Sequence, residues 1–129
     1  MGEVFMRILF FMSITISIVF SDIKIKISKK NKLVHITRSE IIDLYLKKID
    51  NIKGIKVIPI DNKNSYKEFY SKFIKKTPKQ LRAYWIKSDK KRPPKRLSTS
   101  EINKEMIKNS KILSYAKNDL TGKLLFRID

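Results

Sequence analysis

Five consecutive polar residues, Asp61, Asn62, Lys63, Asn64 and Ser65, have the side chains best suited to chemistry in this sequence. They follow a short apolar run and precede an amphipathic one, which predicts a loop leading into the first turn of a helix. Amide hydrogens and the helix dipole at such a point favour an anion. Most junctions of this kind in α/β domains bind nothing, so an anion site and a plain turn both stay open.

In an anion site each of the five side chains would have its own role. Lys63 would supply positive charge, and Ser65 would supply a hydroxyl donor. Asn62 or Asn64 would add amide donors. Asp61 would either accept from a protonated oxygen of the ligand or only shape the turn.

The elements on either side of this loop must position it. Residues 57–60 form a short apolar run rich in β-branched side chains, typical of a strand buried on both faces, and we predict that it is the central strand. Ser65 and Glu68 have the spacing of a capping box, which predicts a helix start at Ser65. Aromatic and apolar residues then recur at helical spacing and are interpreted as core rather than as base-stacking platforms: Tyr66, Phe69, Tyr70, Phe73 and Ile74.

The rest of the chain alternates between strand and helix patterns. Strands are predicted over residues 22–28, 33–36, 111–115 and 123–128, from apolar alternation and flanking turns. Capping boxes predict helices that begin at Thr37, Thr77 and Ser98. The helix after Thr37 is expected to reach Ile49 and to end in a turn at residues 51–54, where Gly54 allows a left-handed conformation.

The two later helices and the segment between them complete the pattern. Inward-facing residues are predicted at Leu81, Tyr84, Trp85 and Ile86 in the first, and at Ile102, Met106 and Ile107 in the second. Residues 87–96 contain two prolines and six Lys or Arg. This segment is predicted to be a loop, either solvated or a nucleic-acid patch. The order predicts a single α/β domain with a mixed β-sheet flanked by helices on both faces.

Composition narrows the functional classes. The chain has 129 residues and a formal net charge of +18, from 30 Lys and Arg against 12 Asp and Glu. Such a surface attracts anions and polyanions at low salt, although lysines also simply solvate helices. With no cysteine and one histidine, His35, the sequence offers no thiol nucleophile and no cysteine or histidine cluster for a metal. We find no catalytic set and expect no enzyme, cofactor or metal site.

Four stretches in a fixed order resemble a known family. They are ITRSEIIDLYL (residues 36–46), VIPID (57–61), SYKEFY (65–70) and PKQLRAYW (78–85). This order resembles short exported proteins related to the substrate-binding component of phosphate ABC transporters, over residues 33 to about 120. The resemblance implies one lobe of a type II periplasmic binding protein and an oxyanion ligand. A second subunit or an ABC transporter would be the partner that completes the cleft.

The sequence also departs from that family. Phosphate binders have a glycine- and serine-rich ligand loop, whereas residues 61–65 here contain no glycine, which limits how closely the backbone approaches an oxyanion. Two functions are therefore carried forward. The first is binding of phosphate or a similar oxyanion at Asp61–Ser65. The alternative is a basic interaction protein that contacts nucleic acid, anionic lipid or an acidic protein, nucleic acid being the least favoured of these partners.

The N-terminal residues predict export. Arg7 precedes an almost unbroken apolar run at residues 8–20, which is short for a membrane span and typical of a secretory signal. We expect a signal peptide at residues 1–21, with translation starting at Met1 or Met6, and a binding-protein-like domain at residues 22–129 in the periplasm or outside the cell. A buried N-terminal helix or an uncleaved anchor is the alternative.

Mass spectrometry of the protein from its native host tests this prediction. We expect a mature chain that begins near Asp22 and lacks the apolar run. An intact N-terminus in a soluble cytoplasmic fraction would contradict export.

Overall fold

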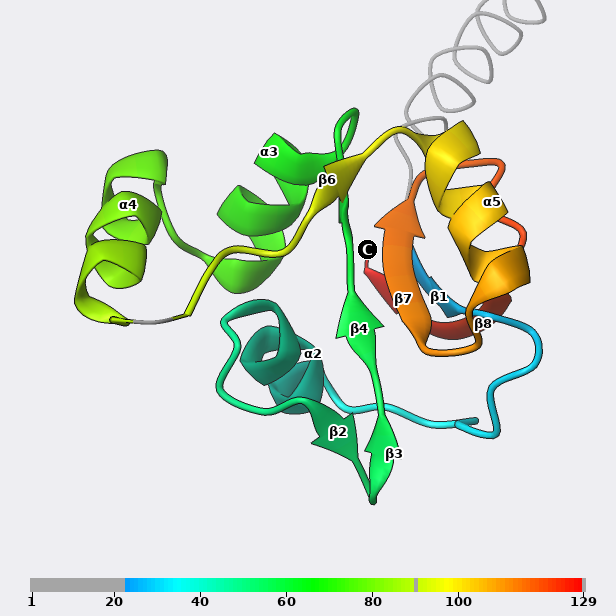
Figure 1. Cartoon of the computed structure of the whole chain (residues 1–129). Helices are drawn as coiled ribbons and strands as arrows, with labels where there is room; N and C mark the ends of the chain where they lie inside the picture. Colours follow the sequence, from blue (N-terminus) through cyan, green and yellow to red (C-terminus); the bar gives the residue numbers. More distant parts are fainter. Residues whose placement is uncertain (1–22, 90, 129) are drawn as a thin grey trace, which may run out of the picture.

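The strand β1 (Ile23–Ile27) lies inside the main sheet, between the last two strands of the chain (Figure 1). It pairs antiparallel with β7 (Ile112–Ala116) on one side and with β8 (Lys123–Ile128) on the other. These pairings come from a computed structural model, which describes residues 23–89 and 91–128. The predicted alternation is confirmed, because the three isoleucines of β1 are buried and the two lysines between them are half-buried.

At the opposite edge of this sheet lies β4 (Ile58–Pro59), which pairs parallel with β7. The strand order is β4-β7-β1-β8, so the prediction that residues 57–60 form the central strand is wrong. The amides of Ile58 and Ile60 donate to carbonyl oxygens on the β7 side, at 2.8 and 2.9 Å. Pro59 between them has no amide hydrogen for a second neighbour, and this confines the segment to an edge.

Helices cover both faces of the sheet, as predicted. On β7, Leu113 and Tyr115 belong to the cluster that includes α2 (Arg38–Tyr45) and the π-helix η1 (Phe69–Ile74). Ile112 and Ala116, which point the other way, pack with α5 (Thr99–Lys108). The described chain is therefore a single α/β domain with a mixed sheet. Its remaining elements are β2 (Asn51–Ile52), β3 (Ile55–Lys56), β5 (Asp61–Asn62), α3 (Tyr66–Glu68), α4 (Pro78–Lys87) and β6 (Arg96–Leu97).

Three of the four predicted capping boxes are present. Thr37, Thr77 and Ser98 each accept from the amide three residues later, and the Glu or Gln at that position accepts in return from the backbone of the cap. In all three the cap residue is extended, with ψ near 160°. These local signals fix where α2, α4 and α5 begin.

The predicted strand at residues 33–36 is absent, and the segment is irregular. Asn31 explains why: its Oδ1 accepts from the amide of Leu33 (2.8 Å), and its Nδ2 donates to the carbonyl of Ser110 (2.8 Å). A side chain that takes a backbone amide in this way competes with a strand ladder. Leu33 and Ile36 are nevertheless buried. The apolar pattern therefore predicted burial correctly and the strand incorrectly.

The helix after Thr37 ends at Tyr45 rather than at Ile49. Lys47 has a φ of 60°, which breaks the helix. The predicted turn with Gly54 instead joins β2 and β3, and Lys53 (φ 51°) and Gly54 (φ 82°) both have positive φ. Two successive positive φ values match the tight turn of a hairpin, which glycine tolerates without strain.

The aromatic run after residue 65 forms the centre of the larger core. Phe69 and Phe73 are almost completely buried, and the Phe69 ring stacks on Tyr115 with centroids 3.8 Å apart. The helix is confirmed, but from Phe69 it winds as a π-helix rather than an α-helix. The core interpretation of this run is therefore correct.

The later helices are less buried than predicted. On α4 no residue is buried, Trp85 is half-buried and Ile86 is 77% exposed. On α5, Ile102 and Met106 are buried as expected, whereas Ile107 is 66% exposed. The inward positions predicted for Ile86 and Ile107 are wrong, because each lies beyond the stripe that contacts the core. α4 stands to one side of the sheet in Figure 1.

The residues that precede β1, including the predicted signal peptide at 1–21, lie outside the described part of the chain. Among the residues that are described, no helix has the length and apolar character needed to cross a membrane.

A comparison of two aromatic substitutions tests this packing. We expect Phe69→Ala to lower the free energy of unfolding by about 3–5 kcal/mol, because the ring is fully buried and leaves a cavity. Trp85→Ala should lower it by roughly 1 kcal/mol or less, because α4 buries none of its residues. Urea denaturation followed by circular dichroism measures both. Equal losses would contradict the assignment of Phe69 to the core and Trp85 to the periphery.

Candidate functional site

The predicted binding loop begins as a strand rather than as a turn. β5, which consists of Asp61 and Asn62, pairs in parallel with β6. The amide of Asp61 donates to the carbonyl of Lys95 (2.7 Å), and the amide of Lys63 donates to that of Leu97 (2.9 Å). These bonds hold the loop against the chain that leads into α5.

Asp61 is buried, with 2% of its surface exposed. Its carboxylate accepts from the hydroxyl of Tyr115 (2.8 Å) and from that of Tyr70 (3.0 Å). Burial raises the pKa of Asp61 from the ordinary 3.8 to about 6, although both hydrogen bonds and the positive charges of Arg96 and Lys47 act to lower it. Burial also raises the pKa of both tyrosines, so their hydroxyls stay protonated and donate.

Asn62 is completely buried and serves the loop itself. Its Nδ2 donates to the hydroxyl of Thr99 at the start of α5 (3.0 Å), and its Oδ1 accepts from the amide of Asn64 (2.8 Å). Both ends of the side chain are thus engaged within the protein. Lys63 and Asn64 are exposed.

Ser65 is not a helix cap, which corrects the prediction of a fourth capping box. Its backbone, with φ −115° and ψ 1°, is not extended as in the other three caps, and its side chain makes no capping hydrogen bond. Within the described chain the Ser65 hydroxyl has no hydrogen-bond partner, even though the residue is only 6% exposed.

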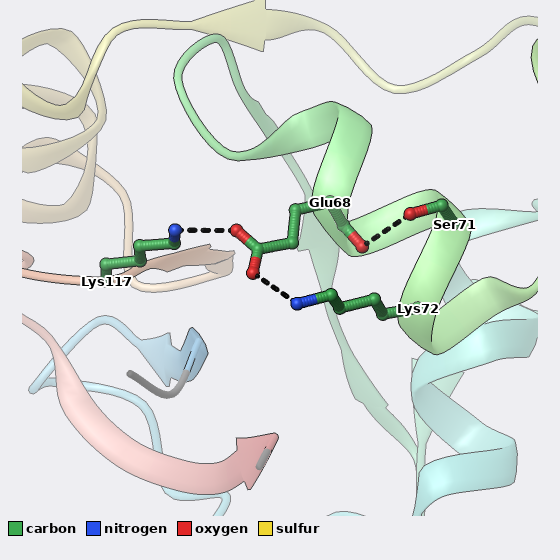
Figure 2. A network of polar contacts seen from close by, with 4 residues as sticks. All are labelled: Glu68, Ser71, Lys72 and Lys117. Atoms are coloured by element: carbon green, nitrogen blue, oxygen red, sulfur yellow. Dashed lines mark hydrogen bonds and ion pairs between the residues drawn. The ribbon is translucent and has the colours of Figure 1, made fainter. Parts of the chain in front are cut away.

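Glu68, the expected partner of Ser65, is engaged elsewhere. Figure 2 shows its carboxylate between Lys117, at 2.7 Å, and Lys72, at 3.0 Å. Hydrogen bonds from these two lysines lower the pKa of Glu68. The pairing ties α3 to the segment that follows β7, and it brings Lys117 close to the predicted loop.

A pocket of about 320 Å³ opens beside the second half of the loop. Asn64 and Ser65 line it, together with Thr99 from the start of α5 and with Lys117, Asn118 and Asp119 from the segment after β7. Of the five predicted residues, the structure therefore brings two, Asn64 and Ser65, into this pocket. Asp61 and Asn62 lie beneath, with internal partners.

Sequence reasoning missed Thr99, Lys117 and Asn118 as neighbours of the loop. These residues lie outside the predicted loop, in segments for which the sequence predicts only a helix that begins at Ser98 and two strands at 111–115 and 123–128. The signal that could have found them is topological: the carboxyl ends of β5 and β7 and the start of α5 meet in this fold, and ligands commonly bind at such a place.

The segment after β7 also borders a second polar pocket, of about 290 Å³. Lys24 and Lys26 of β1 line it along with Lys117. The ammonium group of Lys26 donates to the carbonyl of Leu120 (2.7 Å). Three lysines thus bring positive charge to this pocket, which is offset in part by Asp119 and by Glu68, the ion-pair partner of Lys117.

No family model, curated protein or solved structure was found to match the chain. Nor does any group of three or more acidic or histidine side chains in the described residues form a candidate metal site.

The buried carboxylate of Asp61 predicts an unusual pH dependence. Because its pKa is higher in the folded state than in the unfolded state, its contribution to stability is fully present below the ordinary pKa of 3.8 and is lost as pH rises through about 6. The difference corresponds to roughly 3 kcal/mol. Asp61→Asn keeps the shape of the side chain and has no such proton to lose.

Urea denaturation of the wild type and of Asp61→Asn at several pH values between about 4 and 7 measures this effect. We expect the wild type to lose stability relative to the variant as pH rises across that range. Contributions from other carboxylates, such as Glu68, occur in both proteins and cancel in the difference. Parallel pH profiles would contradict the raised pKa of Asp61.

Proposed function

We propose that this protein is an exported solute-binding protein that binds phosphate or a similar small oxyanion in the pocket beside Asn64 and Ser65. The observation that carries the proposal is Ser65, which lines the pocket and whose hydroxyl makes no hydrogen bond within the described chain. Because no buried side-chain oxygen or nitrogen of the described residues lacks a partner, this hydroxyl reaches solvent and is free to donate to a ligand oxygen.

The other groups of the pocket suit the same ligand. Thr99 offers a hydroxyl, and Asn64 and Asn118 offer side-chain amides. Lys117 offers positive charge and further N–H donors beside the one directed at Glu68. Thr99 is also the first residue of α5, a ten-residue helix whose dipole favours negative charge at that end. The carboxylate of Asp119 opposes an anion and would favour one that carries a proton.

In this proposal the five predicted loop residues divide into two groups. Asp61 and Asn62 hold the loop through Tyr70, Tyr115 and Thr99 and do not touch the ligand. Lys63 contributes long-range attraction, while Asn64 and Ser65 donate directly. The internal hydrogen bonds of the first two residues support this division.

The openness of the site shapes the expected affinity. A ligand held on one lobe stays in contact with water, which weakens each charged hydrogen bond relative to a closed cleft. We therefore expect weak binding by the isolated chain. A second subunit or the membrane component of an ABC transporter would close the cleft and raise the affinity.

Binding of a polyanion is the second candidate function. It is favoured by the charge of +18 and by five exposed basic side chains that do not line the pocket: Lys87, Lys91, Arg92, Lys95 and Arg96. Contacts to a polyanion release many counterions, so their affinity falls steeply with salt. Binding of one small oxyanion by a local set of donors depends on salt far less.

Calorimetric titration with phosphate tests the first candidate. We expect Lys117→Gln to weaken phosphate binding about tenfold, because a hydrogen bond from a charged donor contributes about 1.5 kcal/mol. Lys56→Gln, at an exposed position in the β2–β3 hairpin, makes the same change in net charge and serves as the matched control. Equal effects of the two variants would show that binding depends only on overall charge.

Ser65→Ala gives an independent test. It should weaken phosphate binding several-fold and leave the free energy of unfolding nearly unchanged, because Ser65 makes no capping bond. Alanines at Lys91 and Arg92 should leave phosphate binding unchanged. The polyanion function predicts a different result with a single-stranded oligonucleotide. The alanines at Lys91 and Arg92 would then reduce oligonucleotide binding, Ser65→Ala would not, and the affinity for the oligonucleotide would fall steeply with salt. That result would favour polyanion binding over oxyanion binding.

A further inference from the structure

Asp61 lines a third pocket, which shares no lining residue with the proposed oxyanion pocket. This pocket measures about 290 Å³ and lies between η1, α4 and β6. Its lining includes the carboxylate residue Asp61, the aromatic residues Tyr66, Tyr70 and Trp85, and the arginines Arg82 and Arg96. This pocket thus combines one acidic residue, two arginines and aromatic rings, whereas the exposed basic residues elsewhere are mostly lysines.

The acid of this pocket can accept further hydrogen bonds. Tyr70 and Tyr115 each donate once to Asp61, one to each carboxylate oxygen. A carboxylate has about four acceptor sites, so both oxygens keep capacity for a ligand donor. With a pKa of about 6, Asp61 is mostly ionised at neutral pH and attracts a cation such as an ammonium group.

The two arginines supply the opposite charge. The guanidinium of Arg96 lies over the ring of Tyr66, 3.7 Å from its centre. Within the described residues, no hydrogen bond or ion pair occupies the N–H groups of Arg96 or Arg82, and both side chains are exposed. A guanidinium with free N–H donors can bind a carboxylate through bidentate hydrogen bonds.

The acid and one of the bases lie next to each other. Asp61 and Arg96 are direct partners in the β5–β6 pair, and the charge of Arg96 acts to lower the pKa of Asp61. A ligand that uses both must therefore carry its positive and negative groups close together. An α-amino acid does so, because its ammonium and carboxylate groups share one carbon atom.

The walls and the size of the pocket define the rest of the ligand. Tyr66 and Trp85, with a leucine and two prolines, present apolar surface. Ligand pockets usually hold about 300–1,000 Å³, so this one fits a molecule of amino-acid size. Tyr70 belongs to a π-helical segment, and such segments are rare and frequent at functional sites.

We propose that this pocket binds a free α-amino acid with an apolar or aromatic side chain. Its ammonium group contacts Asp61, its carboxylate contacts Arg82 and Arg96, and its side chain packs against Tyr66 and Trp85. This site is separate from the oxyanion pocket and does not rest on the proposed function.

The single tryptophan of the chain makes the test direct. Trp85 lines the pocket, so its fluorescence reports on occupancy by L-phenylalanine or L-leucine added to the full chain. Phenethylamine, which lacks the carboxylate, and 3-phenylpropionate, which lacks the amine, are the comparison ligands. We expect L-phenylalanine to bind at least about tenfold more tightly than either, with calorimetry as the second readout.

Two arginine variants locate the carboxylate contact. Arg82→Gln should weaken L-phenylalanine about tenfold and leave phenethylamine unchanged. Arg92→Gln, an exposed arginine outside the pocket, is the matched control and should change neither. Since both positions are exposed, neither variant should impair folding.

Several results would overturn the proposal. They are the absence of a saturable change in fluorescence and heat, equal binding of L-phenylalanine and its two half-molecules, tighter binding of a nucleotide, or equal effects of Arg82→Gln and Arg92→Gln. Phosphate should leave Trp85 fluorescence unchanged. Failure here therefore leaves the oxyanion proposal standing, and failure of that proposal leaves this one standing.

Discussion

A buried carboxylate is the constraint on which the rest of this structure depends. Asp61 sits where β5, β7 and η1 meet, and an ionised group at such a place must be hydrogen-bonded. Tyr70 and Tyr115 meet that requirement, and in doing so they fix the distance between the π-helix and the sheet. The preceding carbonyl, of Ile60, accepts from the hydroxyls of Tyr45 (3.0 Å) and Ser114 (2.7 Å). Two consecutive residues thus connect α2, η1 and β7.

This polar centre explains how one short loop can serve two different surfaces. Towards α5, Asn62 holds the backbone so that Asn64 and Ser65 line the polar pocket. Towards α4, Asp61 lines the aromatic pocket. The loop itself is rigid because both of its first residues are buried and paired. A site built on such a loop needs little reorganisation to receive a ligand.

Sequence patterns predicted the features that depend on neighbouring residues. Capping boxes at Thr37, Thr77 and Ser98 gave the correct helix starts, and the alternation in β1 gave the correct buried face. The same rule failed at Ser65, where the residue before the helix adopts a different backbone conformation that the motif alone does not encode. The edge position of β4 could have been predicted from Pro59, because proline lacks the backbone N–H that a central strand donates to its second neighbour.

Features that depend on distant residues could not be predicted. The residues next to Asp61 in the sequence give no indication that Tyr115 contacts it. A polar run that contains a carboxylate has the same pattern as an exposed turn. Glu68 likewise pairs with Lys117 from a remote segment instead of capping its own helix. Of the five predicted site residues, Asn64 and Ser65 line the polar pocket. The division between residues that hold the loop and residues that face this pocket required the fold.

The position of β1 also determines when the sheet can form. Its partners in β7 and β8 come between 86 residues (Ile27 to Leu113) and 105 residues (Ile23 to Ile128) later in the chain, and pairings over such separations slow folding. During synthesis from the N-terminus, the isoleucines of β1 therefore have no partner strand until residues 112–128 have emerged. The main sheet can form only then, and the pairing of β7 and β8 with β1 completes it.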